Sequence, residues 1–218
     1  MSKKYREITE EMKGYTMGLA LFDIVPVLFF LLSGLVLYSM YDSRLLLSGV
    51  LASFAGGLSK VIWKLIVVTR RRDYLVFNKA FRILMPAGFL LMILSVPAGG
   101  KTAFTGLWHG LTSMPALLFF ILGIAGMCVM GYLGSHLDSS VKSNWKEEIL
   151  NTLAQAAILA GVIAVYFASY YHAGDAALTA MKGNDSVSVT PAEYGWCFDG
   201  PGNDDLLIFY PGAKVEAT

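Results

Sequence analysis

Ionisable side chains lie deep inside two apolar stretches of this 218-residue chain, where charged groups are rare. Asp23 is ten residues beyond Lys13. Lys60 is ten residues before Arg70, so at 1.5 Å per helical residue both groups would lie about 15 Å from the same side of a membrane. Lys64 shares a helix face with Lys60 and would lie at about 9 Å. Because charges inside a membrane span are costly, they mark candidate functional groups by default.

A polar stripe in the last apolar stretch adds to these candidates. Glu148, Asn151 and Gln155 follow the spacing i, i+3 and i+7, which places them on one helix face in the same half of the membrane. Pro26 follows Asp23 by three residues and would free a backbone carbonyl nearby. Together these groups predict a polar cavity, open to the cytoplasm, that binds a small anion or a lipid headgroup.

The structural alternative is an ion pair between Asp23 and Lys60, with Lys64 extending toward the membrane surface and the amides joining helices. We favour this alternative, because the sequence shows no further acidic or histidine residue that would complete a proton or ion pathway. Substituting Asp23 and Lys60 would separate the two, since a functional site would lose binding or transport while assembly is unchanged.

Composition places these groups in a membrane protein. The chain is 56% hydrophobic and 15% charged, whereas an ordinary soluble domain is nearer a quarter charged. The predicted fold class is an all-α integral membrane protein, a five-span helical bundle followed by a short β-containing tail. After a polar segment at residues 1–14, the bundle (15–172) has predicted spans at about 15–40, 45–68, 81–98, 115–133 and 149–171.

Two of the spans have further features. The first is too long for a cleaved signal peptide and is typical of a signal anchor. In the fourth, small residues would let helix backbones approach closely in lipid. They are Gly123, Gly126, Gly131 and Gly134. The third loop, residues 99–114, contains Trp108, which we expect to anchor at the membrane interface.

The Lys and Arg residues of the loops predict the orientation. Eleven lie on the side of the N-terminus and four on the other side, so we expect a cytoplasmic N-terminus and an extracytoplasmic tail in the plasma membrane. Arg70, Arg71 and Arg72 form a basic cluster that predicts contact with anionic lipid, not with nucleic acid. The bilayer is thus the expected partner, and the sequence leaves an oligomer open.

Other chemistries have little support. The three histidines, His109, His136 and His172, lie near predicted span ends without partners at ligand spacing, so we expect no metal site. Cys128 and Cys197 indicate neither a disulfide framework nor a metal site. There is no phosphate-binding glycine loop or dinucleotide fingerprint, and we expect no cofactor.

Composition changes abruptly after residue 172. Residues 173–193 are small and polar and predict a linker with one strand at 187–190. Residues 206–210, Leu-Leu-Ile-Phe-Tyr, have the apolar pattern of a strand buried on both faces. Pro211 and Gly212 then end that strand in a loop. We expect this strand to be poorly ordered without a partner sheet.

The segment 194–218 resembles a known fold family. Its two motifs are YGWCFDGPG at 194–202 and LLIFYPGAKV at 206–215. They resemble the opening of α/β-hydrolases, in particular a membrane-anchored bacterial branch related to dienelactone hydrolase. The resemblance implies that the fifth span is the anchor and that Gly212 and Ala213 belong to the loop whose backbone N–H helps form the oxyanion hole. A Gly-containing turn at the end of a strand suits that role.

The sequence also departs from that family. An α/β-hydrolase carries its nucleophile on a Gly-x-Ser-x-Gly elbow, and neither Ser186 nor Ser188 has one. The chain would therefore be a catalytically incomplete part of a membrane-anchored serine ester or amide hydrolase, either truncated or a fragment. The alternative is a non-enzymatic multi-span protein that binds or transports a small anionic or lipidic ligand through its polar cluster.

Overall fold

The computed structural model describes residues 5–169, 178–179, 181–192 and 195–202. The chain forms two compact units, Met1–Tyr166 and Phe167–Thr218, which are described separately. We call the first the helical unit and the second the C-terminal unit. The segment 206–210 and the residues Gly212 and Ala213 lie outside the described residues, so their predicted strand and loop stay predictions.

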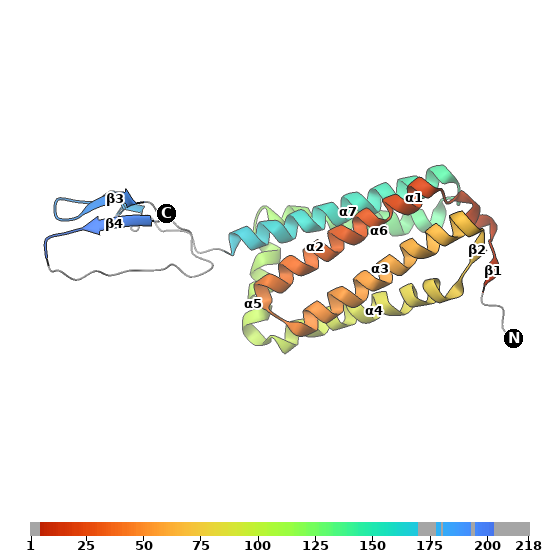
Figure 1. The fold of residues 1–218 in the computed structure, drawn as a ribbon, viewed down its shortest axis with the longest axis horizontal. Helices are drawn as coiled ribbons and strands as arrows, with labels where there is room; N and C mark the ends of the chain where they lie inside the picture. The colour runs from red at the N-terminus through yellow and green to blue at the C-terminus, as the bar shows by residue number, and fades with distance from the viewer. Residues whose placement is uncertain (1–4, 170–177, 180, 193–194, 203–218) are drawn as a thin grey trace. The chain divides into compact units, whose positions relative to one another are not determined.

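Within the described residues, five helical segments are long and apolar enough to cross a membrane, as the sequence predicts. They are Met17–Tyr41, which comprises α1 (Met17–Phe22) and α2 (Ile24–Tyr41), α3 (Arg44–Arg70), α4 (Leu75–Ala98), α6 (Ala116–His136) and α7 (Val141–Ala168). They run roughly along one common direction (Figure 1). These five helices indicate a multi-pass membrane protein.

The first span is interrupted at Asp23, between α1 and α2. The N–H of Asp23 still donates to the Leu19 carbonyl at 3.0 Å. Pro26, at the third position of α2, has no N–H and cannot bond back to the Phe22 carbonyl. The proline therefore explains why the helix is irregular at the buried carboxylate.

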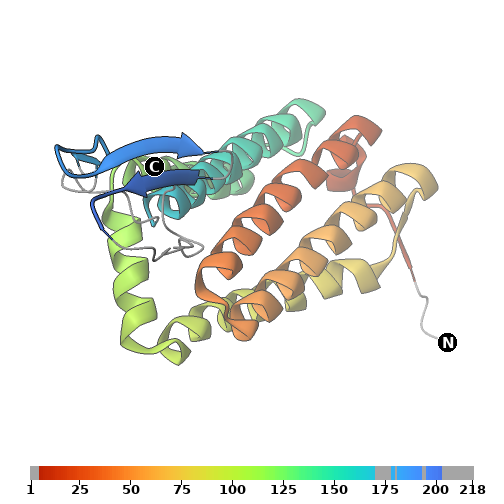
Figure 2. The same ribbon diagram turned by 60° about the vertical axis from the view of Figure 1, so that its left-hand side comes forward.

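The helix limits differ from the predicted ones in three places. α4 begins at Leu75, six residues before the predicted span. α7 begins at Val141, eight residues before the predicted span, because Ser140 starts the helix by accepting a hydrogen bond from the Ser143 N–H at 3.3 Å. The third loop is a helix, α5 (Gly100–Thr112), and it crosses the general direction of the spans (Figure 2). The prediction of a loop there was wrong, because its glycines are tolerated inside a helix.

Small residues set the close helix contacts. A Cβ on Gly88 of α4 would lie 2.5 Å from the Gly49 carbonyl oxygen of α3 and would also meet Ser53 Oγ. On α6, a Cβ on Gly126 would lie 2.9 Å from Ala154 of α7, and Gly123 likewise faces α7. These two contacts confirm the close approach predicted for the fourth span, whereas Gly131 and Gly134 have no such close neighbour.

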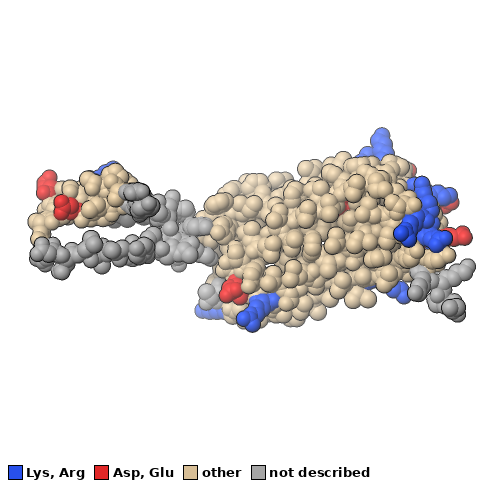
Figure 3. Space-filling view, viewed as in Figure 1, with Lys and Arg blue, Asp and Glu red and all other residues tan. Residues whose placement is uncertain are grey.

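The N-terminal segment folds against one end of the helical unit. Strand β1 (Arg6–Glu7) pairs antiparallel with β2 (Arg72–Asp73), and the 3₁₀ helix η1 (Glu10–Gly14) follows. Met12 of η1 packs with Trp63 and Val67 of α3. Lys and Arg side chains gather at this end, and the surface between the two ends is almost uncharged in the view of Figure 3. We call this the basic end.

The described part of the C-terminal unit contains a β-hairpin. Strand β3 (Ser188–Ala192) pairs antiparallel with β4 (Gly195–Asp199), with Val189 opposite Phe198. The strand predicted at 187–190 is thus confirmed as part of β3. Trp196 and Phe198 of β4 are about half exposed, at 46% and 54%.

Candidate functional site

Asp23, Lys64 and Glu148 form one buried ionic cluster, which we call the buried triad. Lys64 Nζ lies 2.7 Å from Asp23 Oδ2 and 3.1 Å from Glu148 Oε2. The three side chains are only 3–7% exposed. The triad joins the α1–α2 junction, α3 and α7 inside the helical unit, so it ties together segments that are far apart in sequence.

Aromatic and amide groups surround the triad. The Tyr15 ring centroid lies 5.6 Å from Lys64 Nζ, a cation–π contact. On α7, Asn151 Nδ2 donates to Glu148 Oε1 at 3.1 Å. Gln155, one turn further along, contacts Met127 Sδ of α6 at 3.7 Å instead. The predicted stripe on α7 is therefore divided, since Glu148 and Asn151 join the triad and Gln155 faces α6.

The structure corrects the expected pairing of Asp23 and the expected direction of Lys64. Asp23 pairs with Lys64, not with Lys60 as equal depth suggested, because Lys64 is directed inward toward Asp23 and α7, whereas Lys60 lines a cavity. Glu148, a member of the predicted polar cluster, binds the same ammonium group. Lys64 therefore does not extend toward the membrane surface.

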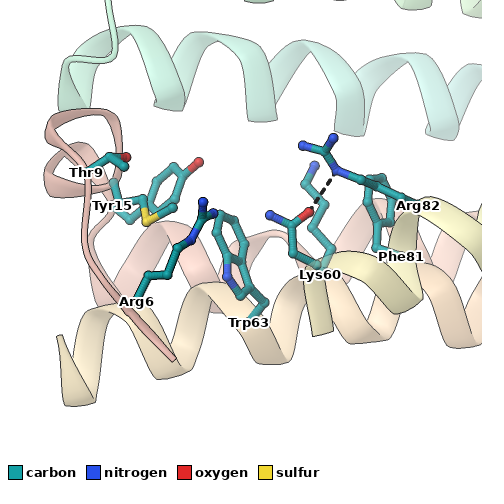
Figure 4. Close-up of a pocket in the computed structure, with 9 residues that line it drawn as sticks. Arg6, Thr9, Tyr15, Lys60, Trp63, Phe81 and Arg82 are labelled. Carbon is teal, nitrogen blue, oxygen red and sulfur yellow. Dashed lines mark hydrogen bonds between the residues drawn. The ribbon is translucent and has the colours of Figure 1, made fainter. Parts of the chain in front are cut away.

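Lys60 instead lines a cavity at the basic end. This basic cavity has a volume of about 370 Å³. Its walls come from the N-terminal segment, α3 and α4 (Figure 4). The lining residues are Arg6, Thr9, Met12, Tyr15, Lys60, Trp63, Asn78, Phe81 and Arg82. Three of them are cationic and none is acidic.

The three cations of the cavity are held differently. Arg6 Nη2 lies 3.0 Å from Asp73 Oδ2, so its charge is already paired. Arg82 Nε donates to Asn78 Oδ1 at 3.0 Å, and Lys60 Nζ lies 5.6 Å from the Phe81 ring centroid. Among the described residues, neither Lys60 nor Arg82 has a carboxylate within ion-pair distance. Two positive charges thus face the cavity without a described carboxylate at ion-pair distance.

Asp73 holds the cavity wall in place. It is fully buried, and its Oδ1 accepts a hydrogen bond of 2.8 Å from Trp63 Nε1. Its Oδ2 accepts from Arg6, whose guanidinium lies near Trp63 in Figure 4. The carboxylate therefore joins the N-terminal segment to α3 and positions one side of the cavity.

Sequence reasoning missed several of these residues. Asp73, Trp63 and Asn78 carry no local signal, because they become a site only when the N-terminal segment folds against α3 and α4. Arg82 is one of the eleven Lys and Arg residues that predict the orientation, and no other feature of the sequence marks it. The Arg6 side chain is largely exposed and pairs with Asp73, which is distant in sequence. Its neighbours in the chain therefore do not indicate that it lines a cavity.

The remaining predicted sites are placed as follows. Arg70, Arg71 and Arg72 lie at the end of α3 and in β2, all exposed, and Arg72 lies over the Tyr5 ring at 4.5 Å. Their contact with anionic lipid stays a prediction. Within the described residues, no group of three His, Cys, Asp or Glu side chains is arranged to hold a metal ion.

Comparisons with known proteins returned no match: no family model, no curated protein and no solved structure is similar to this chain.

Proposed function

We propose that this chain is a multi-pass membrane protein that binds the headgroup of an anionic lipid in the basic cavity. One observation carries the proposal: Lys60 and Arg82, from neighbouring helices, face a cavity of about 370 Å³ without a carboxylate partner among the described residues. Of the two functions expected from the sequence, this one develops the ligand-binding alternative. Lys60 belongs to the predicted polar cluster, whereas Arg82 does not. The cavity lies next to the buried triad and is separate from it.

The chemistry of the lining favours a phosphate group. A guanidinium and an ammonium group donate charge-assisted hydrogen bonds to phosphate oxygens. Asn78 and Thr9 add neutral groups that can orient a headgroup. The half-buried position of Lys60 strengthens its attraction for an anion, because water screens a partly buried charge less than an exposed one.

The surroundings of the cavity favour a lipid over a free anion. α4, which supplies Asn78 and Arg82, also has a strongly exposed apolar face. Val76, Ile83 and Leu90 on this face are 63%, 66% and 56% exposed and lie seven residues apart. Acyl chains can cover such a face while the phosphate remains at the helix end, where headgroups lie.

The orientation expected from the loop charges fits this proposal. A cytoplasmic N-terminus would place the basic end at the inner leaflet of the plasma membrane. That leaflet is rich in anionic lipid, which attracts basic groups near its surface. The exposed Arg70, Arg71 and Arg72 would then increase the local concentration of the same lipids.

The test is thermal unfolding of the protein in a neutral detergent with three added probes. Short-chain phosphatidylglycerol should raise the Tm in a concentration-dependent way, because a ligand that binds only the folded state stabilises it. Inorganic phosphate should do so weakly, and short-chain phosphatidylcholine should not. Equal effects of phosphate and phosphatidylglycerol would indicate a site for a free anion.

Matched variants make the test specific. Lys60→Gln and Arg82→Gln should each reduce the shift caused by phosphatidylglycerol. Lys79→Gln is the control, because Lys79 is an exposed cation of α4 that does not line the cavity. An equal loss in all three variants would mean nonspecific attraction and would contradict the proposal.

A second proposal concerns the C-terminal unit, which we propose is the start of an α/β-hydrolase domain outside the cytoplasm. The supporting observation is the hairpin β3–β4, whose Trp196 and Phe198 are about half exposed. A two-stranded sheet is marginal in water by itself, and further strands would cover these rings. Residues 206–210, which resemble the first long strand of the family, would supply one.

The hydrolase proposal is tested in the native membrane. A fluorophosphonate probe labels serine nucleophiles, so it should label the gene product if the coding frame continues into a domain with a Gly-x-Ser-x-Gly elbow. A frame without such an elbow would refute the hydrolase proposal and leave the lipid-binding proposal unaffected.

A further inference from the structure

The buried triad has an unbalanced charge. Two carboxylates, Asp23 and Glu148, surround the single ammonium group of Lys64. With all three ionised, the triad carries one net negative charge at a site that is nearly closed to water. A buried charge of this kind needs a further compensating group, either a nearby cation or a proton.

The geometry of the triad supplies a place for a proton. The Asp23 and Glu148 carboxyl groups lie against the same ammonium nitrogen, with Asp23 Oδ2 at 2.7 Å and Glu148 Oε2 at 3.1 Å from Lys64 Nζ. Lys64 directs its hydrogen bond to Glu148, and Asp23 Oδ2, although 2.7 Å from Nζ, receives no well-directed hydrogen bond from a described group. Two carboxyl groups that face each other in this way are both acceptors, and a single proton between them makes one a donor.

Lys60 connects the triad to the basic cavity. It lies one helical turn before Lys64 on the same face of α3 and lines the cavity, so its positive charge is close enough to the triad to attract both carboxylates. With the cavity empty, its positive charge offsets the extra negative charge of the triad. An anion in the cavity would offset Lys60 instead, and the triad would again lack one positive charge.

We propose that Asp23 and Glu148 are a proton-binding pair inside the membrane-spanning bundle, and that they take up one proton from solvent when an anion binds beside Lys60. The proton forms an O–H bond to one carboxylate oxygen and a hydrogen bond to the other, and no covalent bond breaks. The coupling rests on the proposed lipid-binding function, whereas the proton-binding pair does not.

The charged groups that face the pair are few. The α1–α2 junction supplies Asp23 itself, α3 supplies Lys60 and Lys64, and α7 supplies Glu148 with the neutral amide of Asn151. Tyr15 contributes its ring face. Within the described residues, no charged side chain of α4 or α6 forms an ion pair with either carboxyl group.

The test measures proton uptake directly, by titration calorimetry of short-chain phosphatidylglycerol into the detergent-solubilised protein in two buffers that differ in ionisation enthalpy. We expect uptake of up to one proton per ligand bound. The affinity should then increase by up to about tenfold per unit fall in pH over the range in which the pair titrates. Binding without proton uptake would overturn the coupling and leave the lipid-binding function standing.

Two variants sharpen the test. Glu148→Gln replaces the carboxyl group by an amide of the same size and so removes the shared proton. This variant should bind phosphatidylglycerol with no proton uptake and a flat pH dependence. Glu147→Gln is the control, because it is the adjacent carboxylate outside the triad and should keep the wild-type uptake. Equal uptake in Glu148→Gln and wild type would overturn the proposal.

An infrared measurement tests the proton-binding pair independently of lipid binding. In the ligand-free protein, a protonated carboxyl band should titrate with pH, and it should be absent in Glu148→Gln. If phosphatidylglycerol does not bind at any pH, the proposed function and the coupling fail together, and a titrating band then still supports the pair. Absence of any such band in the wild type overturns it.

Discussion

Replacing Lys64 by methionine should destabilise the helical unit strongly. Methionine keeps the apolar stem but removes the ammonium group that binds Asp23 Oδ2 at 2.7 Å and Glu148 Oε2 at 3.1 Å. Removing one partner of a buried ion pair typically costs about 3–5 kcal/mol, because a buried charge is left alone. Helices that separate in a detergent micelle still find some polar partners, which lowers the measured cost. We therefore expect a loss of about 3 kcal/mol.

The assay is reversible unfolding in mixed micelles at increasing SDS content, followed by circular dichroism. Lys60→Met is the matched control, because Lys60 lies on the same helix face and has no carboxylate within ion-pair distance among the described residues. A half-exposed cation of this kind should contribute no more than about 1 kcal/mol.

A triple variant tests the reason for the loss. Asp23→Asn, Lys64→Met and Glu148→Gln together remove every charge of the triad, and charge-free replacement of a buried ion pair is often neutral. The triple variant should therefore recover most of the stability lost in Lys64→Met. A loss below about 1 kcal/mol in Lys64→Met, or a triple variant less stable than the single one, would refute the role given to the triad.

Three further predictions concern the packing and the basic end. Gly88→Ala should destabilise the α3–α4 contact by about 1–3 kcal/mol in the same unfolding assay, because its Cβ would clash with α3, whereas Gly131→Ala, which faces open space, should not. A result equal for both would contradict the close contact. Asp73→Ala removes the acceptor that joins Arg6 to Trp63, so hydrogen exchange should increase in residues 5–14 while α7 is unchanged; uniform exchange changes would count against a local role. Hydrogen bonds from Ser143 and a neighbouring serine hold the pKa of the exposed Asp138 carboxyl below its ordinary value of 3.8. Since the folded pKa is lowered, this stabilisation is present above pH 3.8 and is lost as the pH falls through the folded value. The stability difference between wild type and Asp138→Asn should therefore exist at neutral pH and vanish in acid, and a difference that persists in acid would contradict this cause.

The sequence predicts the five long helices because each is an apolar run of sufficient length. It does not predict α5, because Gly106 and Gly110 look like loop residues in isolation. In the structure, Gly110 packs against Val165 of α7, where a Cβ would lie 2.7 Å from Cγ1. Local propensity predicts a helix break at Gly110. The close contact with α7 instead explains why a glycine stands there within a helix.

The members of the buried triad could be found from sequence, but their pairing could not. Counting residues from a helix end gives the depth of a side chain and not the direction in which it points. Lys60 and Lys64 share a face of α3, yet one faces the basic cavity and the other faces Glu148. The position of α7 relative to α3 decides the pairing, and no local pattern contains it.

The basic cavity was beyond sequence reasoning for a similar reason. One of its walls comes from the N-terminal segment, which the sequence shows only as polar. The fully buried Asp73, which binds Arg6 and Trp63, fixes that segment against the bundle. A single carboxylate beside three arginines gives no sign in the sequence of being buried.

The central claim is that Lys60 and Arg82 bind an anionic headgroup. Native mass spectrometry of the protein released from micelles with equal amounts of phosphatidylglycerol and phosphatidylcholine tests it most directly. We expect one retained phosphatidylglycerol, which is lost in the double variant Lys60→Gln, Arg82→Gln and kept in Lys79→Gln. Equal retention of both lipids, or retention of phosphatidylglycerol in the double variant, would contradict it.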